Sequence, residues 1–102
     1  MSTTSVIKMK DYGETLGTRG LGERVREKVL AELRSDENVR IVLDFGGVQV
    51  MTQSFGDELF RKLLVEVGPE RASRVGFSRV TDDVRAVLRY SLATRSEPAS
   101  SP

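Results

Sequence analysis

The segment that most constrains the fold runs from Val39 to Phe60 and reads VRIVLDFGGVQVMTQSFGDELF. Its first five residues, VRIVL, are β-branched or apolar except for one Arg, which is typical of a central strand covered on both faces. The strand ends at Asp44, and a short turn and a brief apolar rise follow it. An amphipathic helix then opens at Ser54. A strand that passes through a turn into a helix is the repeating unit of α/β folds.

Similar patterns predict further elements on both sides of this segment. Apolar residues at a spacing of four indicate helices, and short β-branched runs indicate strands. In chain order we expect a strand at 6–9, a Gly-rich loop at 11–22, a helix over 21–33, a strand at 39–43, a helix over 54–67, a strand at 75–77 and a helix over 81–92. This alternation predicts a small β-α-β-α-β-α domain of two or three layers with a mostly parallel sheet.

Hydroxyl side chains mark the expected helix starts, because they can accept a hydrogen bond from a free backbone N–H in the first turn. Thr18, Ser54 and Thr81 each precede or open a helical pattern. The dipeptide Gly68-Pro69 stops the second helix. If the strands lie in sequential order, the first two helices cover the same face of the sheet. The other face is then thinly covered and open to a partner, a second copy or an extra strand.

Length and composition limit the class of protein. A chain of 102 residues with 38% hydrophobic and 30% charged residues fits one folded domain. We expect that domain over residues 1–94 and a disordered, Pro-containing tail over 95–102. No stretch approaches the roughly 20 apolar residues of a membrane span. The N-terminal segment also lacks an apolar run of the secretory type, so we expect a cytoplasmic protein.

The residue types that are missing exclude several chemistries. The chain contains no His, no Cys and no Trp. Zinc sites depend mainly on Cys and His ligands, and Ser–His or Cys–His catalysis needs the imidazole. We therefore expect no metal, no cofactor and no enzymatic activity.

Ser54 is the leading candidate for a functional side chain. It is expected at a helix N-terminus beside a strand end. As a plain cap, its oxygen would accept a backbone N–H. As a phosphorylation site, it would bring about −1.5 to −2 charges to the positive helix end. The two interpretations are compatible, and Thr52 is the second choice for the modification.

Asp44 has two interpretations that the sequence leaves open. An Asp before Gly46 and Gly47 commonly accepts backbone hydrogen bonds in a turn. An acid at the carboxyl end of a strand also stands where open α/β sheets place their sites. Thr52 and Gln53 in the same loop could supply further polar contacts.

The remaining polar segments give weaker signals. The loop GTRGLG over 17–22 lacks the Gly-Lys-Ser/Thr of a phosphate-binding loop, but Arg19 is placed as an anion contact at a helix start. A basic C-terminal segment gives the alternative function of a small nucleic-acid-binding or anion-binding module. Its residues are Arg79, Arg85, Arg89 and Arg95. The net charge of +1 makes nucleic acid an unlikely partner.

The segment LDFGGVQVMTQSFGDELF, from Leu43 to Phe60, resembles the STAS domains of the anti-sigma-factor antagonists. The Gly17–Arg19 and Phe55–Leu59 segments are most similar to the small bacterial STAS-like family of unknown function. The resemblance covers roughly Val6 to Leu92. It implies a phosphorylatable Ser54. Antagonists carry an Asp before a Ser pair and a Gly after it, where this chain has Thr, Gln and Phe, and we expect it to lack their extra N-terminal strand.

The resemblance also implies a function. We expect a non-catalytic regulatory module that binds a histidine-kinase-like ATPase or anti-sigma factor. The sequence does not decide between a monomer and a homodimer. The expected contact surface combines the loop after the central strand with the exposed face of the following helix. Its residues are Asp44, Gly46, Gly47, Thr52, Gln53, Asp57, Glu58, Arg61 and Lys62.

Overall fold

A computed structural model describes residues 3–96 of the chain. Strands and helices alternate along it, with two short irregular helices, the 3₁₀ turn η1 and the π-helical turn η2. The elements are β1 (Thr4–Lys8), η1 (Met9–Tyr12), β2 (Thr15–Leu16), α1 (Arg19–Ser35), β3 (Arg40–Asp44), β4 (Val50–Met51), α2 (Gln53–Gly56), η2 (Asp57–Arg61), α3 (Lys62–Ala72), β5 (Val75–Ser78) and α4 (Asp82–Ser96).

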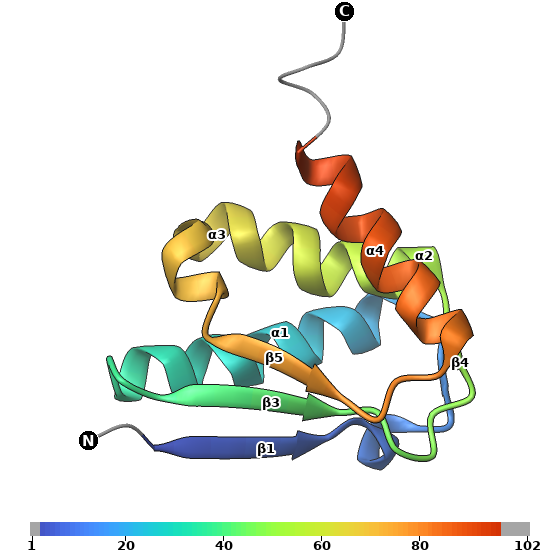
Figure 1. The fold of residues 1–102 in the computed structure, drawn as a ribbon, viewed down its shortest axis with the longest axis horizontal. Helices are drawn as coiled ribbons and strands as arrows, with labels where there is room; N and C mark the ends of the chain where they lie inside the picture. The colour runs from blue at the N-terminus through green and yellow to red at the C-terminus, as the bar shows by residue number, and fades with distance from the viewer. Residues whose placement is uncertain (1–2, 97–102) are drawn as a thin grey trace, which may run out of the picture.

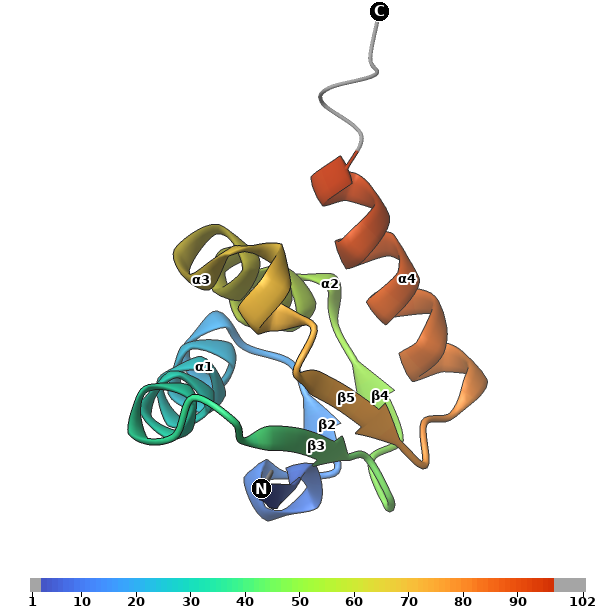
Figure 2. The same cartoon turned by 60° about the vertical axis from the view of Figure 1, so that its left-hand side comes forward.

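The three longer strands form a parallel sheet in the order β1-β3-β5. Val6 of β1 lies opposite Val42 of β3, which lies opposite Gly76 of β5. The helices α1, α3 and α4 lie to one side of this sheet (Figures 1 and 2). The predicted α/β class and the parallel pairing are therefore confirmed, in a two-layer arrangement, and the strands lie in sequential order.

The alternation of side chains along the strands explains the two layers. Ile41 and Leu43 of β3 are buried under the helices. On the opposite face Val6 is 56% exposed, and a Cβ placed on Gly76 would meet no atom within 4 Å. One face of the sheet is thus bare, as expected from the sequential order.

A second, two-stranded sheet was not expected from the sequence. β2 pairs with β4 in parallel, with Thr15 opposite Val50 and Leu16 opposite Met51. The prediction of a loop throughout 11–22 is wrong at this strand. The prediction missed it because a two-residue strand is too short to show a period in the sequence.

The second long helix is continuous in space but changes geometry along its length. It comprises α2, the π-helical turn η2 and α3 as far as Val67. Gly68 interrupts it with a φ of 86°, a conformation that glycine adopts without steric cost, and one more turn follows to Ala72. The predicted stop at Gly68-Pro69 is confirmed.

The C-terminal helix α4 begins as predicted, because Thr81 Oγ1 accepts a hydrogen bond from Val84 N at 3.2 Å. Val84 and Leu88 are buried, and the helix continues to Ser96. The first two residues of the predicted tail are therefore helical. Residues 97–102, the rest of that tail, lie outside the described part of the chain.

Candidate functional site

Pairing of β2 with β4 brings the starts of α1 and α2 side by side, because each of these strands leads directly into its helix. Thr52 N donates to Leu16 O at 2.9 Å, directly after the last pair of the register. A Cβ placed on Gly17 would lie 3.7 Å from the Thr52 Cγ2 methyl group. Two helix N-termini that are 34 residues apart in the sequence thus meet at one place, which we call the helix-start cluster (residues 17–20 and 52–54).

Each of these helix starts is capped by a threonine. Thr18 Oγ1 accepts from Leu21 N at 3.1 Å, as predicted. In the second helix Thr52 Oγ1 accepts from Phe55 N at 3.2 Å. The interpretation of Ser54 as the N-cap is therefore wrong, since the helix begins two residues earlier than its hydroxyl would require.

Ser54 occupies the second position of the helix and is half-buried. Among the described residues its hydroxyl forms no hydrogen bond, whereas the hydroxyl of Thr52 is engaged as a cap. The backbone N–H groups of Arg19, Gly20, Gln53 and Ser54 also have no hydrogen-bond partner within residues 3–96. Free N–H groups at the positive end of a helix attract anions.

Glu58 lies one turn further along the helix from Ser54, and it is not the exposed contact residue that we expected. It is only 6% exposed and turns toward α1. Its carboxylate lies 3.0 Å from Arg26 Nη1, 3.1 Å from Lys62 Nζ and 3.6 Å from Arg19 Nη1. Hydrogen bonds from Arg26 and then Lys62 lower the pKa of Glu58 below its usual value.

The close approach of α1 to the π-helical turn explains why Glu58 is buried. A Cβ placed on Gly22 of α1 would lie 2.9 Å from Glu58 Cβ and 3.0 Å from Phe55 O. A glycine is therefore required at this contact. A π-helical turn inserts an extra residue into the helix, and such turns often occur at functional sites.

Gln53 and Asp57 face the C-terminal helix α4. Gln53 Nε2 donates to Ser91 Oγ at 2.9 Å and to Asp57 Oδ1 at 3.3 Å. Ser91 is fully buried, and sequence analysis missed it. A Cβ placed on Gly56, the last residue of α2, would lie 2.7 Å from Ser91 Oγ, which shows how tightly α4 packs against α2. The only sequence signal for Ser91 is its place in the apolar series of the helix, where a polar residue is unusual.

Asp44 lies apart from the helix-start cluster and forms its main contacts with the loop after β5. Arg79 donates from Nε to Oδ1 at 2.9 Å and from Nη2 to Oδ2 at 2.6 Å. Gly46 N donates to Oδ1 at 2.9 Å, as the turn interpretation expected. Hydrogen bonds from Arg79 and then from the Gly46 N–H lower the pKa of Asp44 to about 2.

The two glycines after β3 have distinct structural roles. A Cβ on Gly46 would lie 2.6 Å from the guanidinium carbon of Arg79, so a larger residue at this position would displace that side chain. Gly47 has a φ of 85°, in the left-handed region. Together with Lys8 and Lys10 these residues line a polar cavity of about 440 Å³ at the carboxyl ends of β1, β3 and β5.

The expected contact surface therefore divides into two places. Asp44, Gly46 and Gly47 belong to the carboxyl end of the main sheet. The other expected residues follow the start of α2, where Arg61 is half-buried and Lys62 is held by Glu58. No residue of 52–62 lines the polar cavity.

The described architecture is that of a compact α/β domain, with a parallel sheet alternating with helices along the chain. Over residues 22–85, more than half of its length, the chain matches the family described as STAS-like domain of unknown function (DUF4325), and it belongs to that family. No curated protein and no solved structure matches it significantly. Among residues 3–96, no helix is both long and apolar enough to cross a membrane.

Proposed function

We propose that this protein is a non-catalytic, regulatory protein-interaction module that contacts its partner through the helix-start cluster. The observation that carries the proposal is the meeting of two capped helix starts, one of which carries the free hydroxyl of Ser54 at its second position. Membership of the STAS-like family supports an interaction role. The resemblance to anti-sigma-factor antagonists favours a histidine-kinase-like ATPase as the partner.

Phosphorylation of Ser54 is the proposed switch. A phosphate would add about −1.5 to −2 charges beside the positive end of its own helix, which would stabilise it locally. It would also stand one turn from Glu58 and compete with that carboxylate for Arg19, whose side chain is 62% exposed. The surface presented to the partner would become anionic without unfolding the domain.

Ser54 is a better candidate than Thr52 for the modified residue. The Thr52 hydroxyl is used as the helix cap, so modification there would remove a hydrogen bond of the fold. Loss of such a cap typically costs about 1 kcal/mol. Modification of Ser54 removes no hydrogen bond among the described residues.

The test combines a kinase assay with a binding assay. The purified protein is incubated with ATP and a histidine-kinase-like ATPase encoded beside it, and the modified residue is located by mass spectrometry. Ser54→Asp should weaken binding of that ATPase by about tenfold, a loss of about 1.4 kcal/mol. The control is Ser35→Asp, at an exposed position at the end of α1. Equal binding by both variants and the unchanged protein would contradict the switch.

A further inference from the structure

The free edge of β5 borders an apolar groove that the proposed function does not use. β5 is the last strand of the sheet β1-β3-β5, and within residues 3–96 no strand pairs with its other side. Arg74 O accepts from Ile41 N, and Ser78 O accepts from Phe45 N, both at 2.9 Å. Along a strand, the N–H and C=O groups of every second residue point to the same neighbouring strand. Those of Arg74, Gly76 and Ser78 point to β3, so the N–H and C=O groups of Val75 and Phe77 face the free edge.

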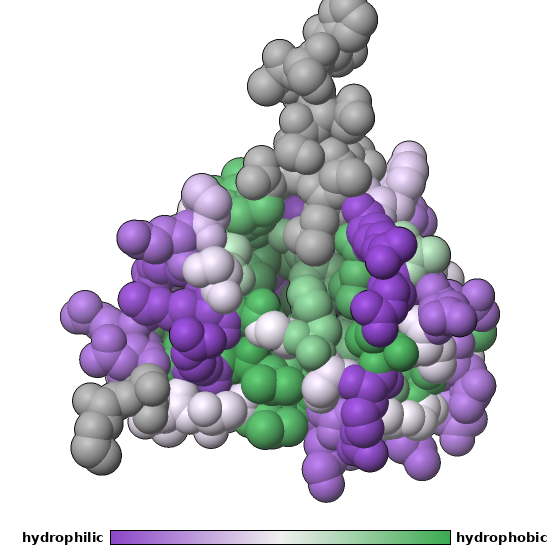
Figure 3. Space-filling view, in the orientation of Figure 1, coloured by the Kyte–Doolittle hydropathy of each residue, from purple (hydrophilic) through white to green (hydrophobic). Residues whose placement is uncertain are grey.

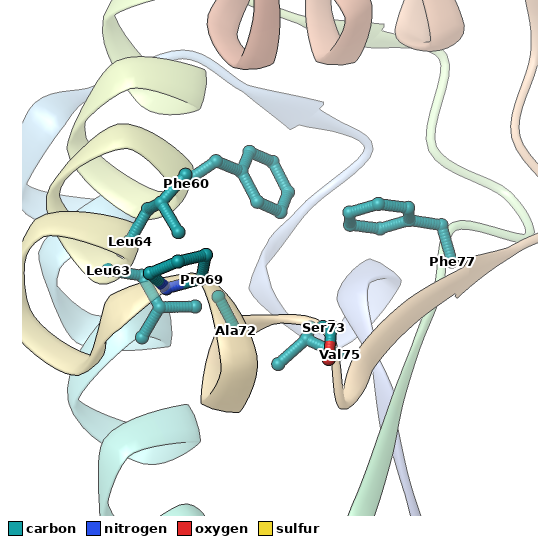
Figure 4. Close-up of a pocket in the computed structure, with 8 residues that line it drawn as sticks. All are labelled: Phe60, Leu63, Leu64, Pro69, Ala72, Ser73, Val75 and Phe77. Carbon is teal, nitrogen blue, oxygen red and sulfur yellow. The ribbon is translucent and has the colours of Figure 1, made fainter. Parts of the chain in front are cut away.

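The groove beside this edge is almost entirely apolar. A cavity of about 310 Å³ lies between α3 and β5, and Figure 4 shows the rings of Phe60 and Phe77 pointing toward one another across it. Their centroids are 5.1 Å apart in an edge-on arrangement. The other lining residues are Leu63, Leu64, Pro69, Ala72, Ser73 and Val75. Figure 3 shows apolar side chains in the middle of this face, with hydrophilic groups to either side.

At its other end the groove becomes basic. Phe77 also lines a second cavity of about 430 Å³, which continues toward α4 and is lined by Arg79, Arg85 and Arg89 but by no acidic residue. Among the described side chains, Arg85 and Arg89 form no ion pair, while Arg79 is bound to Asp44. Carboxylates on a bound segment would complement this end.

The two edges of the sheet differ in their protection. Proteins commonly guard exposed edges with charged side chains, especially lysine. The cavity beside β1 is lined by Lys8, Arg24 and Lys28. The four residues of β5, VGFS, carry no charge, so this edge lacks such a guard.

We propose that the free edge of β5 binds an extended segment of a partner protein, with apolar side chains at alternate positions and acidic residues at its α4 end. The segment would hydrogen-bond to Val75 and Phe77 as an added strand, a common mode of peptide recognition. Its apolar side chains would fill the groove under α3, and its carboxylates would meet Arg85 and Arg89.

Charge argues against a second copy of the chain as the occupant. A second β5 strand would bring no carboxylate to Arg85 and Arg89, because its four residues, VGFS, carry no charge and the residues that flank it, Arg74 and Arg79, are basic. Residues 97–102, EPASSP, contain no large apolar side chain that could fill the groove.

A peptide-display selection on the full chain tests the proposal. Enriched peptides should alternate apolar residues and carry Asp or Glu at one end. Binding of an enriched synthetic peptide should slow hydrogen exchange at the amides of Val75 and Phe77. The amides of Gly76 and Ser78, which face β3, should change little. Enrichment of other patterns, or unchanged exchange at Val75 and Phe77, would overturn the proposal.

A matched pair of variants locates the binding site. Leu64 lines the groove, whereas its neighbour Val65 is 75% exposed and does not. Leu64→Arg should weaken the peptide affinity by about tenfold or more, and Val65→Arg by less than about twofold. If Leu64→Arg does not fold, Ser73→Glu, at an exposed lining position, replaces it. Equal affinities for the groove variant and Val65→Arg would contradict the site.

Two further measurements separate the alternatives. Arg89→Glu should weaken the affinity for the acidic peptide by about threefold, while Arg24→Glu on α1 should leave that affinity unchanged. A concentration-dependent dimer that Leu64→Arg abolishes would identify a second copy as the occupant and overturn the proposed partner. The inference does not rest on the helix-start cluster, so Ser54→Asp should leave peptide binding unchanged.

Discussion

The Asp44 region and the Glu58 region each hold a nearly buried carboxylate against basic side chains, but the cations differ in exposure. The main partner of Asp44, Arg79, is 69% exposed and lies over a turn. The main partner of Glu58, Arg26, is 12% exposed and lies between α1 and η2. A cation that stays in water loses little when its partner is removed, whereas a buried cation is left without compensation. The exposure of the partner therefore decides how much each carboxylate contributes to stability.

The largest effect is expected for Glu58→Ala. Removing this carboxylate leaves Arg26 charged and buried, so the free energy of unfolding should fall by about 3 kcal/mol. Chemical denaturation measures this loss in the free energy of unfolding. The matched control is Glu66→Ala, whose ion pair with Arg34 is exposed on both sides. The control should lose at most about 0.5 kcal/mol, and similar losses in both variants would break the comparison.

A second variant tests whether α1 and η2 are in tight contact. Gly22→Ala places a methyl group against Glu58 Cβ and Phe55 O. Overpacking of this kind typically costs about 2 kcal/mol. Gly20→Ala on the same helix is the control, because its nearest neighbour would be 4.0 Å away, and it should be neutral or stabilising. A stable Gly22→Ala protein in denaturant titration would show that the helices can separate at little cost.

The smallest effect at neutral pH is expected for Asp44→Asn. The folded pKa of Asp44 is about 2, below the value of about 4 for an unfolded chain. The stability from its pairing is therefore complete above about pH 4 and is lost as the pH falls toward 2. Thermal unfolding midpoints measured over this range should fall less steeply for Asp44→Asn than for the unchanged protein. Parallel curves would mean that the pairing with Arg79 contributes nothing.

Elements with a clear period could be predicted from the sequence. The strand ending at Asp44 and the helix starts at Thr18 and Thr81 follow from apolar spacing and capping chemistry. The pairing of β2 with β4 could not, because each strand has two residues and the contact joins distant parts of the chain. The meeting of the two helix starts depends on that pairing, so the sequence could not predict it either.

Two assignments around the second helix failed for identifiable reasons. Thr52 and Ser54 both offer a capping hydroxyl, and local sequence does not rank them. Glu58 was expected on the exposed face because a charged helical residue usually is. The π-helical turn and the close approach of Gly22 instead turn it toward α1. Neither a change in helical geometry nor a tertiary contact leaves a recognisable pattern in the local sequence.

The short pairing of β2 with β4 has a consequence for how the domain is recognised. Leu16 and Met51 are both buried, and they set how far apart the two helix starts lie. A partner that contacts both helix starts at once recognises their spacing as well as their chemistry. Its specificity would then depend on two side chains that it never touches.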